Sequence, residues 1–187
     1  VDLLAPEFSE TLDLSRTPRA KASEMEHAIR KHCKVNLERD PALYKKLSEK
    51  LEALIQRHKD DWDLLCRELE RLRDEVQEGR QESEDGLSAK EAPFHDLIGQ
   101  IAFDGQAVPD EHKEKMQELT REIIDNLEDT IAVVNFWSQN VKIRELKGAL
   151  SDTMLFSGIP EVEEKCDKIV TEIVALARAR HNDLMKN

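Results

Sequence analysis

Two histidines and one cysteine lie within residues 21–34, KASEMEHAIRKHCK. Histidine pairs on one helix bind a metal when they are four residues apart, but His27 and His32 are five apart and diverge by about 140°. Glu24 and His27 have the E-x-x-H spacing of di-iron helical bundles, which need a second such pair. No other histidine has a glutamate three residues before it, so the pattern does not favour a metal site.

The three cysteines show no catalytic pattern. Cys33 would need a nearby histidine and an asparagine or aspartate to act as a nucleophile. It lies on the apolar face of its own predicted helix, so we interpret it as a small buried hydrophobe, and Cys66 and Cys166 in the same way. His58 lies among leucines and is interpreted as a packed histidine. The glycines occur singly and no G-x-S-x-G motif is present, so we predict no catalytic residue and no cofactor in this chain.

The composition favours an all-α protein. Charged residues make up 36% of the 187 residues, aromatic residues make up 4%, and strong helix formers dominate. The net charge of −12 disfavours nucleic-acid binding by the whole surface, because acidic chains repel phosphate. An odd number of unpaired cysteines, with no signal peptide and no membrane-spanning run, predicts a cytoplasmic protein. The chain begins with Val1, which suggests a piece of a longer polypeptide.

One short region is basic within this acidic chain. Residues 16–34 carry six cations against two glutamates. The simplest interpretation is a solvated helix face, and the functional one is a patch that contacts DNA or an acidic partner. The candidate residues are Arg16, Arg19, Lys21, Arg30, Lys31 and Lys34.

A second candidate is an aromatic pair in the apolar stretch IAVVNFW, residues 131–137. Phe136 and Trp137 either pack in the core where the chain turns or form an anchor at a protein interface, where tryptophan is favoured. We add Arg144 to this candidate interface. The conformation of residues 131–137 stays open, because periodicity alone does not separate a strand from a buried helix there.

The elements that position these residues follow from start and stop signals. Residues 1–20 are expected to be an extended lead-in, and Ser23 with Glu26 forms the capping box S-x-x-E at the start of a helix. Asp40 and Pro41 start the next helix. An apolar stripe at steps of three and four then favours one long helix over about 41–78. The stripe consists of Leu43, Leu47, Leu51, Leu54, His58, Trp62, Leu65, Leu69, Leu72 and Val76.

The second half of the chain is expected to contain shorter helices. The polar loop 79–87 separates two helical parts of one domain, residues 21–187. Ser88 and Glu91 form a second capping box. Ser138 is expected to cap a helix with Val141 inward, and a final helix is expected to start at Pro160.

Two long stretches of this sequence resemble a known family. RTPRAKASEMEHAIRKHC followed by ERDPALYKKLSEKLEALIQRHKDDWDLL resembles the C-terminal region of type I restriction enzyme R subunits. The later VNFW, IRELKGAL, LFSGIPE and KIVTEIVALARARH resemble the extreme C-terminal helical domain of the same subunits. The resemblance runs from about residue 16 to the end and rests on extended sequence rather than on an active-site motif.

The resemblance implies a role in a larger enzyme. The R subunit is an endonuclease and ATP-dependent DNA translocase that uses ATP and Mg²⁺, and its helical C-terminal region attaches the motor to the methyltransferase and specificity subunits. This chain holds none of the nuclease or ATP-site motifs. We therefore expect a non-catalytic docking domain preceded by the helicase region. The alternatives are a domain that braces the helicase lobes and contacts DNA through residues 16–34, and an unrelated helical protein-interaction module.

Overall fold

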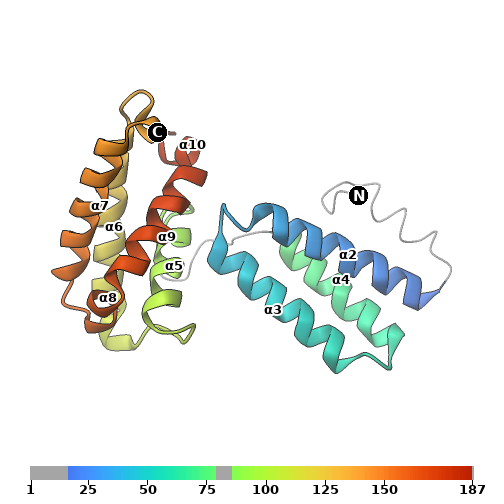
Figure 1. Ribbon diagram of the computed structural model, residues 1–187. Helices are drawn as coiled ribbons and strands as arrows, with labels where there is room; N and C mark the ends of the chain where they lie inside the picture. Colours follow the sequence, from blue (N-terminus) through green and yellow to red (C-terminus); the bar gives the residue numbers. More distant parts are fainter. Residues whose placement is uncertain (1–16, 79–85, 187) are drawn as a thin grey trace. The chain divides into compact units, whose positions relative to one another are not determined.

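The computed structural model describes residues 17–78 and 86–186, and every regular element in these ranges is a helix (Figure 1). The all-α class and the multi-helix architecture predicted from the sequence are confirmed. Contacts divide the chain into two units, residues 1–81 and 82–187, each with its own apolar core. In the described ranges no helix is long and apolar enough to cross a membrane.

The first unit is a bundle of three helices. These are α2 (Pro18–Asn36), α3 (Pro41–Arg57) and α4 (Trp62–Glu78), which lie side by side in Figure 1. Each helix directs one apolar stripe inward, because apolar residues recur every three or four positions. The core is formed by Ala22, Met25, Ala28, Ile29, Cys33, Leu47, Leu51, Leu54, Leu65, Cys66, Leu69, Leu72 and Val76.

Helix α2 begins earlier than predicted. Thr17 is its N-cap, and the Thr17 hydroxyl accepts a hydrogen bond from the backbone N–H of Ala20 at 3.2 Å. Pro18 occupies the first helical position, where a missing N–H costs nothing. Ser23 therefore lies inside the helix, so the predicted capping box at Ser23 is wrong and residues 18–20 are helical. The remainder of the expected lead-in, residues 1–16, lies outside the described residues.

The long helix predicted over 41–78 is also wrong. Helix α3 ends at Arg57, and residues 58–61 form a short turn before α4. Asp61 starts α4: its Oδ1 accepts from the N–H of Leu64 at 3.0 Å, and its carbonyl accepts from the N–H of Leu65 at 2.9 Å. The apolar spacing continued through the turn because α3 and α4 pack against each other and contribute leucines to one shared core.

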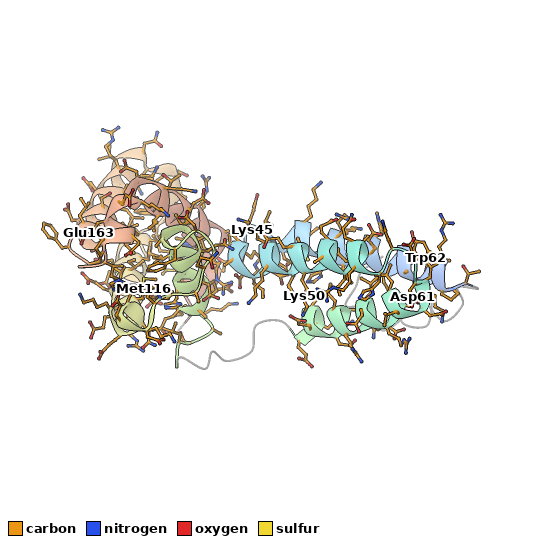
Figure 2. All side chains as sticks on the ribbon, turned by 90° about the horizontal axis from the view of Figure 1, so that it is seen from below. Lys45, Lys50, Asp61, Trp62, Met116 and Glu163 are labelled. Carbon is orange, nitrogen blue, oxygen red and sulfur yellow. The ribbon has the colours of Figure 1, made fainter. Side chains whose placement is uncertain are left out.

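The two bulky members of the predicted stripe lie at this turn rather than in the core. His58 is half-buried and Trp62 is exposed. Asp61 and Trp62 lie together at one end of the first unit, as Figure 2 shows.

In the described residues the second unit is built from six α-helices and two short 3-10 helices. Its elements are α5 (Ala92–Ala102), η1 (Asp110–His112), α6 (Lys113–Ile131), η2 (Phe136–Ser138), α7 (Asn140–Leu155), α8 (Pro160–Glu164), α9 (Cys166–Ala179) and α10 (His181–Leu184). Helix α9 packs on α5 and α7, and α6 packs on α7 and α5. Their inward faces form one continuous apolar core, with Phe94, Met116, Leu127, Leu150 and Ile173 among its fully buried members.

The predicted capping box at Ser88 and Glu91 is confirmed. The Glu91 carboxylate accepts from the N–H of Ser88 at 2.7 Å, and the Ser88 hydroxyl accepts from the N–H of Glu91 at 3.2 Å. These reciprocal bonds close the turn that leads into α5 and satisfy two backbone donors.

The stretch 131–137 turns out to be a helix end followed by a turn. Helix α6 ends at Ile131, and Asn135 adopts a left-handed conformation with φ of 57° before η2. Asparagine tolerates this region better than most residues with a side chain. Helix α7 then begins after Gln139 without a side-chain cap, so the predicted cap at Ser138 is wrong.

The final predicted helix is divided into α8, α9 and α10. Lys165 occupies the break between α8 and α9, and its Nζ donates to the carbonyls of Ile101 and Ala102 at 3.1 and 2.9 Å. It also binds Asp104 Oδ2 at 2.7 Å, and this hydrogen bond lowers the pKa of the Asp104 carboxyl. A positive charge at the last carbonyls of α5 complements the helix dipole, so Lys165 links α5 to the C-terminal helices.

Candidate functional site

The histidines and cysteine of residues 21–34 do not converge. Glu24 and His27 are exposed, and Cys33 is buried in the core of the first unit. Burial raises the pKa of the Cys33 thiol, which lowers the fraction of reactive thiolate. Across residues 17–78 and 86–186 there is no group of three or more histidine, cysteine, aspartate or glutamate residues that could hold a metal ion.

The other two cysteines are also core residues. Burial raises the pKa of the thiols of Cys66 and Cys166. The Sγ of Cys66 donates to the carbonyl oxygen of Pro18 at 3.0 Å, and the Sγ of Cys166 donates to that of Ser151 at 3.7 Å. Each thiol is therefore a packed side chain bonded to backbone rather than a nucleophile facing a cavity.

The predicted basic patch is less concentrated in the structure than in the sequence. Arg16 lies outside the described residues. Arg19 is exposed and lies over the ring of Trp62, 5.3 Å from its centroid. Lys21 is half-buried. It is two residues from Arg19 and nine from Arg30, which correspond to rotations of about 200° and 180° around the helix axis, so it lies on the opposite side of α2 from both.

Acidic residues offset part of this charge. Arg30 binds Glu26 at 2.8 Å and also binds Glu52 of α3, and hydrogen bonding to these glutamates raises the Arg30 pKa. Lys31 and Lys34 are exposed on α2. Over residues 17–78 the chain has 14 lysines and arginines against 14 aspartates and glutamates, so this range has no net charge.

The aromatic pair lies in η2, just before α7. Phe136 is 1% exposed and belongs to the core, so it presents no surface to a partner. Its ring contacts Trp137 edge to face, with centroids 5.0 Å apart. Trp137 is half-buried, and its Nε1–H donates to Nδ1 of His181 at 3.2 Å. Arg144 is exposed on α7; its role at an interface stays a prediction.

Two exposed apolar side chains lie on α7, one on either side of Gly148, and the exposed carboxylates of Glu145 and Asp152 lie between them. Val141 and Leu155 are 64% and 49% exposed, and Gly148 lies midway between them. A spacing of seven residues places all three on one face of the helix. The buried face of α7 is different and consists of Leu146, Leu150 and Met154. We call Val141, Gly148 and Leu155 the α7 stripe.

Phe156 follows the stripe directly and is 87% exposed. The turn after it is held by three hydrogen bonds centred on Gly158, which has a left-handed φ of 66°. Lys115 Nζ donates to the Gly158 carbonyl at 3.2 Å, and the Gly158 N–H donates to Glu163 at 3.1 Å. The N–H of Ile159 donates to the Ser157 hydroxyl at 3.3 Å. A large aromatic side chain therefore faces water on a well-bonded turn.

A groove of about 460 Å³ lies beside this turn, between α6 and the end of α7. Three of its lining residues are acidic, namely Glu118, Glu122 and Asp152, and Phe156 forms part of its wall. Its one basic lining residue, Lys115, is bonded to the Gly158 carbonyl. The complete lining is Lys115, Glu118, Leu119, Glu122, Asp152, Thr153, Phe156 and Ser157.

The sequence contained a signal for this surface. Val141 was predicted to point inward and is exposed, so that prediction is wrong. Apolar residues on α7 follow two sets of spacings, and only the set containing Leu146 and Leu150 is buried. The apolar residues outside the buried set, Val141 and Leu155, were therefore the signal for this surface.

Comparison with protein-family models identifies the family of this chain. A family model described as "Type I restriction enzyme HindI endonuclease subunit-like, C-terminal" matches residues 1–182. Searches among curated proteins and among solved structures each returned no match. The family match covers both units and agrees with the resemblance found in the sequence. The chain therefore belongs to the family of type I restriction enzyme HindI endonuclease subunit-like C-terminal domains.

Proposed function

We propose that this chain is a docking domain, which holds the motor subunit of a type I restriction enzyme on its methyltransferase and specificity subunits. The observation that carries the proposal is the pair Leu155 and Phe156, exposed next to each other at the end of α7, because adjacent exposed apolar side chains mark protein-interaction sites. Aromatic residues, phenylalanine among them, are also enriched at protein interfaces.

The proposal assigns no chemistry to this chain. DNA cleavage, ATP-dependent translocation and the binding of ATP and Mg²⁺ belong to other parts of the whole subunit, and the assembly is cytoplasmic. The family match supports this assignment. The three cysteines also support it, because their thiols are buried and burial raises the pKa of each thiol.

The test mixes the purified chain with the cognate methyltransferase–specificity complex, followed by size-exclusion chromatography with mass detection. We expect co-elution of the wild-type chain, and loss of co-elution for Phe156→Ser combined with Leu155→Ser. The matched control is Val134→Ser, which removes a valine that is 80% exposed on the turn before η2. The proposal fails if the wild-type chain stays separate while circular dichroism shows that it is folded.

DNA contact through residues 16–34 is the competing function. Lys31 and Lys34 are exposed and would approach phosphates freely in solvent, but the ion pairs of Arg30 weaken this surface. Fluorescence anisotropy with duplex DNA distinguishes the two functions, since phosphate contacts make affinity fall steeply with salt. Salt-dependent binding that disappears in Lys31→Glu with Lys34→Glu would favour DNA contact.

A further inference from the structure

Phe156 is presented to solvent by a short turn with fixed ends. The turn consists of residues 155–158 and lies between two core side chains, Met154 and Ile159, which are each 0% exposed. Its first part stays attached to α7, because the N–H of Phe156 donates to the Asp152 carbonyl at 3.1 Å. Contacts in the second part of the turn therefore decide how firmly Phe156 is held.

Two side chains from other helices bind the turn at Gly158. Lys115 of α6 donates from Nζ to the Gly158 carbonyl at 3.2 Å. Glu163 of α8 accepts from the Gly158 N–H at 3.1 Å. Gly158 is therefore bonded through both of its backbone polar groups, one to α6 and one to α8.

This arrangement needs a glycine. Gly158 has a φ of 66°, a left-handed conformation that residues with a side chain disfavour. A Cβ added at this position would also lie 3.3 Å from Lys115 Nζ, which is tighter than ordinary van der Waals contact. The close approach of the lysine to the turn therefore depends on the absence of a side chain at Gly158.

The two hydrogen bonds matter more for binding than for folding. Lys115 is exposed and Glu163 is half-buried, so water can replace either bond and the fold loses little when one is absent. A partner that binds a mobile segment must order it, and this ordering weakens the affinity. A turn that is already ordered binds more tightly through the same contacts.

We propose that Lys115 and Glu163 are positioning residues, which hold the turn at Gly158 so that Phe156 is ordered before it contacts the partner. The inference rests on the proposed docking function and identifies the residues that prepare the docking site. Each acts through the backbone of Gly158 on the aromatic side chain two residues earlier.

Variants of opposite charge separate this role from a charge effect. Lys115→Met removes the donor and a positive charge, whereas Glu163→Ala removes the acceptor and a negative charge. Biolayer interferometry of the full chain on the immobilised methyltransferase–specificity complex should show both variants weakened about tenfold, equivalent to about 1.4 kcal/mol. Opposite effects of the two variants would assign them to charge alone, and unchanged affinity of either would exclude positioning by that residue. Both outcomes would overturn the proposal.

Two further variants supply the controls. Glu163→Gln keeps an acceptor oxygen for the Gly158 N–H and should bind like the wild type. Lys168→Met removes one exposed positive charge from α9 and should also bind like the wild type. If Glu163→Gln binds as weakly as Glu163→Ala, or if Lys168→Met binds as weakly as Lys115→Met, charge explains the result and the proposal is wrong.

A spectroscopic measurement reports the turn itself. Backbone ¹⁵N relaxation should give order parameters of about 0.85 for residues 156–158 of the wild type, as in rigid backbone, and below about 0.6 in Lys115→Met. Urea unfolding followed by circular dichroism should have nearly the same midpoint in both proteins. Unchanged order parameters, or a midpoint that falls together with the affinity, would contradict a positioning role.

The binding data distinguish this inference from the docking function itself. If the complex binds the wild type and Lys115→Met equally, docking stands and the positioning role is wrong. If the complex does not bind the wild-type chain, docking itself fails and this inference falls with it, even where the order parameters show a rigid turn.

Discussion

Replacing Gly148 by alanine should stabilise the second unit. The alanine Cβ would point into open space, since no heavy atom lies within 4 Å of its position. The only change on folding is then a smaller loss of backbone freedom, worth about 0.5–1 kcal/mol in a helix interior. For a unit of roughly 100 residues, 1 kcal/mol raises the melting temperature by about 4–8 °C, so we expect an increase of about 2–8 °C.

The measurement needs a signal from the second unit alone. Trp137 belongs to this unit, so its fluorescence in a Trp62→Phe background reports the unfolding of this unit. Thermal and urea unfolding are compared with and without Gly148→Ala in that background. A decrease in the free energy of unfolding would refute the reasoning, because it would mean that the alanine side chain meets an obstacle or that α7 is not helical at this position.

Four further predictions concern a helix cap, an ion pair and the thiols. Asp61→Ala should lower the free energy of unfolding of the first unit by about 0.5–2 kcal/mol through loss of the α4 N-cap. The measurement is urea unfolding followed by the fluorescence of Trp62. No change in the free energy of unfolding would mean that the capping hydrogen bonds do not stabilise the unit. Lys165→Met should destabilise the second unit by about 1–2 kcal/mol, because it removes charged hydrogen bonds to the end of α5. The control Lys147→Met changes an exposed position of α7 and should have little effect. Both variants are measured in the same unfolding assay, which follows the fluorescence of Trp137. The lowered pKa of Asp104 means that its ionised form stabilises the fold above the unfolded pKa of about 4, and that this contribution is lost as the pH falls through the folded pKa. Lys165→Met should therefore make the free energy of unfolding fall less steeply below about pH 4. An unchanged pH dependence below about pH 4 would contradict the pairing of Lys165 with Asp104. The three thiols of the folded chain should react with Ellman's reagent much more slowly than those of the urea-unfolded chain, because burial raises the thiol pKa of Cys33, Cys66 and Cys166. Equal reaction rates for the folded and the unfolded chain would contradict this burial.

The sequence predicted the helices better than their ends. The capping box at Ser88 and Glu91 is confirmed because both partners are local and both hydrogen bonds form. The same motif at Ser23 failed because Thr17 and Pro18 start the helix one and a half turns earlier. Periodicity could not reveal the turn after Arg57, since helices on both sides of a turn direct leucines to one core and the spacing continues unchanged.

The candidate surface was harder to predict for a different reason. Apolar spacing shows that a face is apolar, but only packing shows whether another helix covers it. Val141 and Leu146 looked alike in the sequence, yet one is exposed and the other is buried against the core. Phe136 was chosen as an interface residue and is buried, whereas Phe156 was not chosen and is exposed.

The packing of α5 has a consequence for the order in which the chain folds. Helix α5 ends at Ala102 and packs against α9, which begins at Cys166, so the core of the second unit joins segments that are far apart in sequence. In the first unit the most distant helices that pack together are α2 and α4, which are separated by α3 alone, so its contacts join segments that are closer in sequence. Folding rates fall as contacting residues become more distant in sequence. We therefore expect the first unit to fold early during synthesis, and the second to complete its core only after α9 has left the ribosome.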